Sequence, residues 1–326
     1  MTEEQLEPDS QIHFEHFKIF KPMWSSMIAV VALVAWSPHG ATAVSLREPR
    51  PGKRGPPPPP PPKPKPSGPS RTVPWQVMVY LDEGDFFGVY GGGALLSDRW
   101  VVTSGRNLLM EHSKKTPVPK VYVGVAKFED AWPSKEVPVE KVFVHPGFQN
   151  SSKWANDVAL IKLSAPVAFN QTVMPIPLPE QGDEEEETPG VAAIFGAWDQ
   201  GIIHELPSAI KHLKLPVVSR KECRASFTKP SDPVIDDTKF CTGPSEHFMN
   251  TCFNDAGSAM VFQNAKTNRV YIGGVVSNNM ACAIRRHAVS TKISAYLPWI
   301  RDTMREDQEV AVQRAALVAD LYSGKI

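Results

Sequence analysis

WQVMVYL, at residues 75–81, is the first of a series of short runs rich in β-branched and aromatic residues, with turn residues between them. The later runs have the same character and are KVYVGVA (120–126), EVPVEKVFV (136–144), DVALIKL (157–163), VAAIFG (191–196), HLKLPVV (212–218), SAMVF (258–262) and VYIGGVV (270–276). Such residues fit the pleated surface of a sheet, and many short strands in succession are typical of a β-sandwich or a pair of barrels. The sequence therefore predicts an all-β domain from residue 75 onward.

After these runs the pattern becomes helical. ISAYLPWIRDTMR (293–305) predicts a closing α-helix with Pro298 near its first turn, where proline is tolerated. The tail at 306–326 contains the weakly amphipathic QRAALVADLY, for which we expect a short docked helix.

The overall composition excludes several classes of protein. The 326 residues include 35 Lys+Arg and 35 Asp+Glu, so the net charge is zero and gives no electrostatic basis for binding nucleic acid or an anionic membrane surface. Apolar residues make up 42%, which suits a packed core. The 32 prolines are the outlier, and they are concentrated in residues 44–73. Because proline lacks an N–H donor and favours an extended conformation, we expect this segment to be a disordered, semi-rigid linker.

An apolar run near the N-terminus predicts secretion. WSSMIAVVALVAW (24–36) is shorter than the roughly 20 residues that a spanning helix needs, so it is typical of a signal peptide and not of a membrane span. Ala41-Thr42-Ala43 follows as a cleavage site, which assigns residues 1–43 to an N-terminal extension and signal peptide. The alternative is a short buried helix. Because residues 1–22 are long and acidic for such a segment, translation from Met23 is a further hypothesis.

The cysteines and two asparagines agree with an extracellular protein. Cys223, Cys241, Cys252 and Cys282 include no CxxC pair and no histidine at zinc-ligand spacing, so we expect two disulfides and neither a metal nor another cofactor. Asn150 in Asn-Ser-Ser and Asn170 in Asn-Gln-Thr are candidate glycosylation sites. Secretion also argues against the proline-rich segment being a ligand for SH3-type domains.

Several motifs together resemble the trypsin-like serine protease family from Val73 to Arg305. They are PWQV (74–77), GGGALLSDRWVVTSG (91–105), NDVALIKL (156–163) and CFNDAGSAMVF (252–262). The resemblance implies a domain at 74–305 built of two antiparallel β-barrels and a C-terminal α-helix. It also implies that Cys223 pairs with Cys241, and Cys252 with Cys282.

The positions that carry catalysis in that family hold other residues here. Active members use a serine nucleophile, a histidine base and an aspartate that orients the histidine. The matching residues are Ala256, Arg106 and Asp157. Alanine has no hydroxyl, and arginine stays protonated, so neither can take its usual role. Ser258 is no substitute because its side chain would point elsewhere, and we expect Asp157 to pair with Arg106 in a pseudoprotease domain that is not an enzyme.

Three further departures agree with this interpretation. Active members are cut before Ile-Val-Gly-Gly, and the new amino group pairs with the residue that Asp255 matches. No such sequence precedes Trp75, so Asp255 must pair elsewhere or stay solvated. Asn250 stands where the charge of the substrate pocket is set, and Ser277-Asn278-Asn279 replaces the Ser-Trp-Gly segment that pairs with substrate.

Among non-catalytic relatives, these losses resemble the haptoglobins, and the full-length tail resembles the fish type. TCFNDAGSA (251–259), Arg106-Asn107-Leu108 and VMPIPLP (173–179) carry the likeness. The resemblance implies a plasma protein that binds haemoglobin αβ dimers and scavenges free haemoglobin, with a clearance receptor as a further partner. Pro177 stands where the family has the cysteine that joins its two chains, so we expect no disulfide-linked multimer.

A second class of function remains open. GGGALLSDRW (91–100) is equally close to the complement initiation proteases. A pseudoprotease of that kind would regulate or act as a decoy in a complement-type cascade, and it would bind protease substrates or inhibitors in place of haemoglobin.

Overall fold

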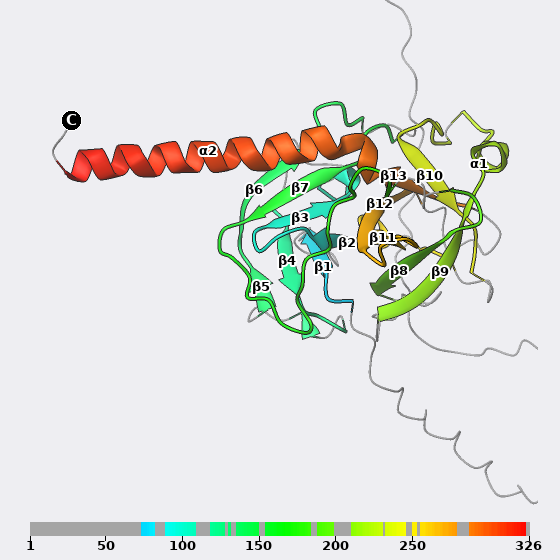
Figure 1. Cartoon of the computed structure of the whole chain (residues 1–326), viewed down its shortest axis with the longest axis horizontal. Helices are drawn as coiled ribbons and strands as arrows, with labels where there is room; N and C mark the ends of the chain where they lie inside the picture. The colour runs from blue at the N-terminus through cyan, green and yellow to red at the C-terminus, as the bar shows by residue number, and fades with distance from the viewer. Residues whose placement is uncertain are drawn as a thin grey trace, which may run out of the picture. The chain divides into compact units, whose positions relative to one another are not determined.

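The computed structural model describes most of the chain from residue 73 onward (Figure 1). The described residues are 73–81, 89–108, 118–127, 130–131, 135–149, 154–183, 188–198, 210–230, 232–245, 250–252, 255–278 and 287–323. The predicted signal peptide, nearly all of the proline-rich linker, Asn150 and Cys282 lie outside them. Within the described part of the chain, no helix has the length and apolar character needed to cross a bilayer.

The first half of the domain is an antiparallel sheet of seven strands, in the order β5-β4-β1-β2-β3-β7-β6. Its strands are β1 (Gln76–Leu81), β2 (Val89–Leu95), β3 (Trp100–Thr103), β4 (Lys120–Val123), β5 (Glu136–Val137), β6 (Val139–Val144) and β7 (Ala159–Leu163). The predicted run 136–144 is divided at Pro138, because proline offers no N–H to a ladder. The run that begins at Lys120 ends early, since Gly124 turns the chain with a φ of 64°.

The second half is a closed barrel in the order β10-β13-β12-β11-β8-β9. It consists of β8 (Ala192–Trp198), β9 (Ile210–Val218), β10 (Lys239–Thr242), β11 (Ala259–Gln263), β12 (Val270–Asn278) and β13 (Ala288–Lys292). The short helix α1 (Arg220–Ser226) follows β9 and is capped by Ser219, whose hydroxyl accepts the N–H of Glu222 at 3.2 Å. The predicted all-β fold with a C-terminal helix is confirmed, but only the second half is a closed barrel; the first half, which we call the first barrel, is an open sheet. Our strand runs missed β2, β3, β10 and β13: VYGGGAL is rich in glycine, and WVVT, KFCT and AVSTK are only four or five residues long.

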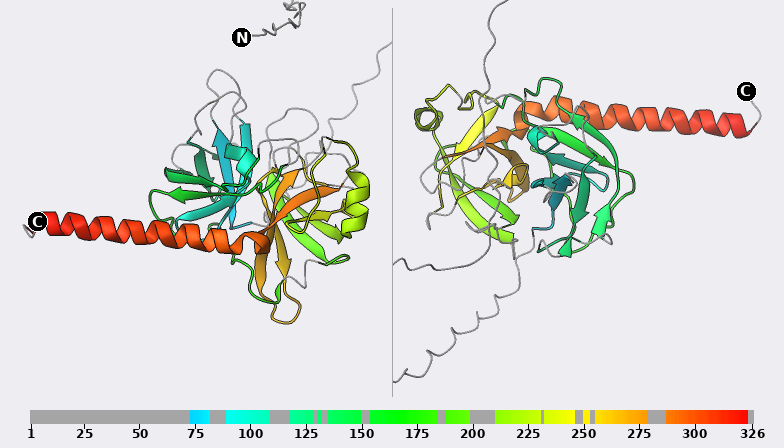
Figure 2. Two further views of the ribbon diagram at one scale, coloured as in Figure 1. Left: turned by 90° about the horizontal axis from the view of Figure 1, so that it is seen from above. Right: turned by 180° about the vertical axis from the view of Figure 1, so that it is seen from behind.

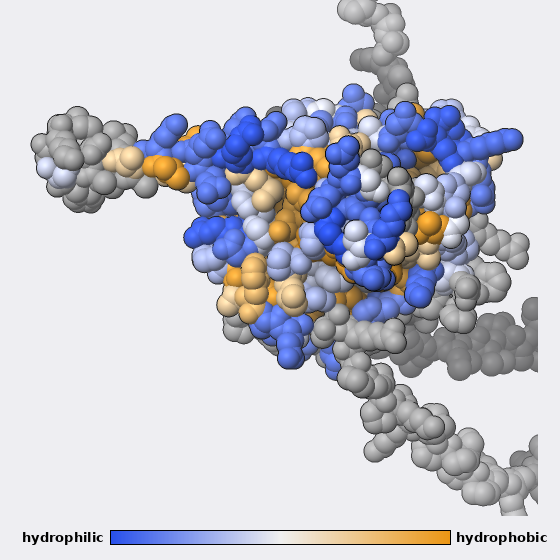
Figure 3. Space-filling model, viewed as in Figure 1, coloured by the Kyte–Doolittle hydropathy of each residue, from blue (hydrophilic) through white to orange (hydrophobic). Residues whose placement is uncertain are grey.

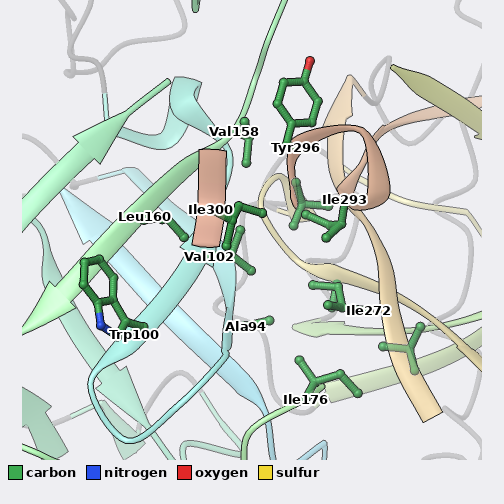
Figure 4. Close-up of a cluster of buried hydrophobic side chains, with 13 residues drawn as sticks. Ala94, Trp100, Val102, Val158, Leu160, Ile176, Ile272, Ile293, Tyr296 and Ile300 are labelled. Carbon is green, nitrogen blue, oxygen red and sulfur yellow. The ribbon is translucent and has the colours of Figure 1, made fainter. Parts of the chain in front are cut away.

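A hydrophobic cluster lies between the two halves (Figure 4). Its buried members come from the first sheet and its loops, from the second barrel, and from the C-terminal segment. They are Ala94, Trp100, Val102, Val158, Leu160, Ile176, Ala259, Val261, Ile272, Val275, Ile293, Tyr296 and Ile300. Because residues from both barrels complete this core, the loops at their junction are held in fixed register.

The C-terminal helix is longer than the sequence pattern suggested. A 3₁₀ turn at Ile293–Tyr296 leads directly into α2 (Leu297–Tyr322), which runs past residue 305 without a break. The expected division into a helix at 293–305 and a separate tail from 306 was therefore wrong. Figures 1 and 2 show α2 passing β6 and β7 and leaving the barrels. Val310 and Val312 are 40% and 63% exposed there, and Figure 3 shows hydrophobic surface on this part of the helix.

Candidate functional site

Asp157 lies at the junction of the two barrels, just before β7, and three side chains or backbone groups converge on it. The backbone N–H of Arg106, in the 3₁₀ turn Gly105–Leu108, donates to Oδ1 of Asp157 at 2.8 Å. Ser277 of β12 donates its hydroxyl to Oδ2 at 2.6 Å, and Thr291 of β13 donates to the backbone carbonyl at 2.9 Å. The aspartate therefore links segments of both barrels.

The Asp157 carboxyl is completely buried. Burial raises its pKa, while the positive charge of Arg106 and the hydrogen bonds from Ser277 and the backbone work in the opposite direction. Each oxygen of the Asp157 carboxylate accepts a hydrogen bond, so the group is held in one orientation.

The sequence motif predicts that Arg106 stands at the position of the family's catalytic histidine. The guanidinium carbon of Arg106 lies 5.4 Å from the centroid of the Trp154 ring, and Trp154 stacks on Phe148 with centroids 6.4 Å apart. Burial lowers the pKa of Arg106, and Asp157 raises it. Since arginine remains a cation at physiological pH, this side chain is an electrostatic partner of Asp157 and cannot accept a proton.

The loop before Asp157 has a strained backbone. Trp154 and Asn156 have φ values of 45° and 54°, in the left-handed region that residues with a side chain rarely adopt. Asn156 is held there by two bonds: its amide donates to the carbonyl of Gly147 at 2.7 Å, and its oxygen accepts the hydroxyl of Tyr296 at 3.0 Å. Strain of this kind is typical of sites with a constrained shape.

Ala256, which the sequence motif predicts to stand at the nucleophile position, is held through its backbone. Its carbonyl accepts the N–H of Gly92 at 2.7 Å and the side-chain amide of Asn107 at 2.7 Å. The same amide of Asn107 donates to the hydroxyl of Thr103 at 3.1 Å. Asn107 thus fastens the loop of the second barrel to the first, a role that the sequence motif Arg106-Asn107-Leu108 did not disclose.

Ser258 forms a hydrogen bond across the junction of the barrels. It is fully buried, and its hydroxyl accepts the side-chain amide of Gln76 at 3.0 Å. Gly92 lies so close that a Cβ added there would come within 1.8 Å of this hydroxyl, which explains why a glycine is needed at that position. Ser258 is therefore a structural link between β1 and the Ala256 loop.

Asp255 forms an ion pair with a lysine of the second barrel. Nζ of Lys211, on β9, lies 2.8 Å from Oδ2 of Asp255, and both side chains are almost fully buried. Of the two outcomes that we left open for Asp255, pairing elsewhere is the one observed. A signal for Lys211 was present in the sequence, because it is in phase with the inward-facing Leu213 and Leu215 of an alternating strand, and a buried lysine requires an anion.

The remaining predicted sites lie apart from Asp157. Cys223 and Cys241 form a disulfide, and Cys252 is disulfide-bonded too. Asn170 is exposed in a turn, where its side-chain oxygen accepts both the N–H and the hydroxyl of Thr172 at 2.8 Å. Asn250 accepts the N–H of Thr251 at 2.9 Å. The described part of the chain holds no cluster of side chains suited to a metal ion.

Comparison with known proteins agrees with this fold. A family model described as Trypsin matches residues 65–300, so the chain belongs to the trypsin family. Its similar relatives include the haptoglobin of Mesocricetus auratus, 28% identical over 256 residues that cover 72% of this chain and 68% of the relative. The haptoglobin-related protein of Homo sapiens is 27% identical over 255 residues, covering 72% and 68%, and the haptoglobin of Bos taurus is 29% identical over 252 residues, covering 72% and 58%. The predicted resemblance to haptoglobins is confirmed, while the fish type stays a prediction.

Proposed function

We propose that this chain is a secreted, non-catalytic trypsin-family protein that binds haemoglobin αβ dimers and so scavenges free haemoglobin. The observation that carries the proposal is the likeness to proteins named haptoglobin over 72% of the chain. A rigid pair of barrels displays loops suited to recognising a protein surface, and a partner that is not cleaved stays bound.

The residues at the degenerate site support a role without catalysis. Ala256 offers no nucleophile, and Arg106 offers no base. Loss of either group in an unrelated serine hydrolase costs about 10⁶-fold in turnover. The hydroxyl of Ser258 is engaged by Gln76, and the Asp157 carboxylate is engaged by the Arg106 backbone and Ser277.

Secretion is part of the same proposal. The Cys223–Cys241 disulfide suits an oxidising compartment, and the exposed Asn170 is accessible to glycosylation. Digestion with an N-glycosidase should reduce the mass of the protein secreted by animal cells, and Asn170→Gln should remove one glycan. A secreted chain of unmodified mass would contradict the predicted glycosylation.

The direct test is size-exclusion chromatography of the purified protein mixed with dilute haemoglobin, read at the haem absorbance. We expect haem absorbance to co-elute with the protein at the mass of one chain plus an αβ dimer, at physiological salt. Haemoglobin cross-linked so that it cannot dissociate, and myoglobin, serve as controls. Absence of co-elution with dimers would overturn haemoglobin binding.

In that case the complement-type decoy, favoured by GGGALLSDRW (91–100), becomes the function to test. Capture of complement proteases or their inhibitors from plasma would support it. Catalysis is tested separately with a fluorophosphonate probe, which should leave the protein unlabelled. Stoichiometric labelling would show that the chain has a working nucleophile.

A further inference from the structure

A buried ion pair joins β9 to the turn at 255–258 that carries Ala256. Nζ of Lys211 lies 2.8 Å from Oδ2 of Asp255, and the two side chains are only 5% and 1% exposed. The same oxygen of Asp255 accepts the backbone N–H of Cys252 at 2.5 Å. The Lys211 ammonium also lies 5.9 Å from the centroid of the Phe195 ring on the neighbouring β8. Each charge is therefore compensated inside the protein.

Lys211 stands at a position of β9 whose neighbours in phase face the interior of the barrel. Along this strand Leu213, Leu215 and Val217 face inward and are buried, while His212 and Lys214 are exposed. Lys211 shares the phase of the inward set. An ammonium group at such a position is unfavourable unless an anion meets it, so Lys211 and Asp255 depend on each other.

Asp255 is the first residue of this turn. Its backbone N–H donates to the carbonyl of Cys252 at 3.0 Å, and its own carbonyl accepts the N–H of Ser258 at 3.0 Å. Gly257, with a φ of 82°, donates to the carbonyl of Val276 at 2.8 Å. The carboxylate that pairs with Lys211 therefore belongs to Asp255, the residue whose backbone hydrogen bonds hold the turn.

We propose that Lys211 is a built-in counter-charge that holds the turn at 255–258 in its conformation in the uncut chain. In active members of the family, cleavage supplies an amino group that meets the matching aspartate. Here a side-chain ammonium from β9 supplies that charge, so the turn needs no proteolytic step to order. Lys211 is a positioning residue, because it acts on the turn through Asp255, and the inference holds whatever partner the protein binds.

Hydrogen–deuterium exchange of the full-length protein tests the pair. In Lys211→Met, we expect peptides covering 250–262 to exchange at least about tenfold faster, while peptides from β1 and β2 change little. Lys214→Met is the matched control, since it removes an exposed lysine from the same strand, and it should leave the turn unchanged. Exchange of the turn in Lys211→Met at the wild-type rate, or a uniform increase across both barrels, would overturn the proposal.

A double variant keeps the test decisive if the single variant folds poorly. Lys211→Met combined with Asp255→Asn removes both charges, so it should recover much of the protection of the turn that Lys211→Met loses. A second readout is chemical rescue: n-propylammonium should restore protection of the turn to Lys211→Ala, whereas n-propanol should not. A double variant no better protected than Lys211→Met, or equal effects of the amine and the alcohol, would contradict the role of the charge.

Dependence on cleavage is tested on the wild-type protein. The uncut chain and the chain cut at Arg71 should show the same protection in peptides covering 250–262. Protection that rises only after cutting would show that a new amino group, and not Lys211, orders the turn.

Discussion

Asp157 is a single residue on which segments of both barrels depend. It is fully buried, and it accepts the N–H of Arg106 and the hydroxyl of Ser277. Asp157→Ala would leave both donors without an acceptor and remove the counter-charge of Arg106, so we expect the free energy of unfolding to fall by about 3 kcal/mol. Urea denaturation at neutral pH measures this change.

Two matched variants show whether the loss of unfolding free energy comes from the Asp157 carboxylate itself. Asp157→Asn keeps the shape and one acceptor oxygen, and it should cost less than Asp157→Ala. Asp98→Ala removes an exposed aspartate and should change the free energy of unfolding by less than about 0.5 kcal/mol. Equal stability of Asp157→Ala and the wild type would refute a structural role for this carboxylate.

His145 gives the stability a pH dependence of its own. Its Nδ1 accepts the N–H of Gly147 at 3.1 Å, and its ring meets those of Tyr296 and Trp299 edge-on, with centroids 5.2 and 5.0 Å away. Burial lowers the pKa of His145, so the unfolded chain takes up this proton first as the pH falls. The stability that the neutral ring contributes is complete above its ordinary pKa of about 6.5 and is lost as the pH falls below it.

His145→Phe should therefore flatten the dependence of unfolding free energy on pH between about 8 and about 5. The variant keeps a ring in the aromatic cluster but cannot be protonated. A slope in His145→Phe as steep as in the wild type would assign the pH dependence to other groups.

Among the secondary-structure elements, α2 is fastened to the first sheet by one acidic side chain. Asp307 is 7% exposed and forms ion pairs with Lys141 of β6 and Lys162 of β7, the latter at 2.5 Å. Lys162 also pairs with Glu140 at 3.0 Å. Burial alone would raise the pKa of Asp307, but hydrogen bonds and the charges of the two lysines bring it below its ordinary value. The stability that this carboxylate contributes is present above its ordinary pKa and is lost as the pH falls through the lowered value.

Asp307→Asn should lower the free energy of unfolding by about 2 kcal/mol at neutral pH, because two lysines lose a shared counter-charge. The difference from the wild type should disappear in acid, where the wild-type carboxyl is itself protonated. Guanidinium denaturation at both pH values provides the measurement. Glu306→Gln, on the exposed side of the same helix, should have little effect. A difference that persists in acid would mean that packing, and not charge, fastens α2.

The elements also show what the sequence could and could not predict. Runs rich in β-branched and aromatic residues located most strands, because such residues fit the pleated surface of a sheet. The continuation of α2 was predictable too, because 306–322 contains no glycine or proline that would end a helix. The pairs Lys211–Asp255 and Lys141–Asp307 were not predictable, because each joins residues far apart in sequence that only the closed fold brings together.

The candidate site, too, could be predicted only in part from the sequence. Motif matches identified Arg106, Asp157 and Ala256 as positions, since they depend only on the order of residues. They could not show that Asn107 fastens the Ala256 carbonyl to the first barrel, or that Gln76 engages Ser258, because both bonds cross the junction between the barrels. What the sequence lacks is the geometry of that junction.

For the molecule as a whole, that junction predicts cooperative unfolding. Ile272 of β12 is fully buried in the cluster that also contains Leu160 of the first sheet and Ile300 of α2 (Figure 4). Each half has a hydrophobic cluster of its own, but because this third cluster is shared by both, a cavity in it should destabilise both barrels. Ile272→Ala should lower the free energy of unfolding by about 2–5 kcal/mol, whereas Ile194→Ala, which truncates a side chain 37% exposed on β8, should cost much less.

Native-state hydrogen exchange distinguishes a shared core from two separate ones. The slowest amides of β3 and of β11 should lose the same amount of protection in Ile272→Ala, since both exchange only when the shared core opens. A loss confined to the second barrel would mean that the two barrels open independently. Equal loss of protection would mean that a partner bound to the loops of either barrel stabilises both barrels. The contacts of Asp157 and Asn107 across the junction would then contribute to the affinity of loops that they do not touch.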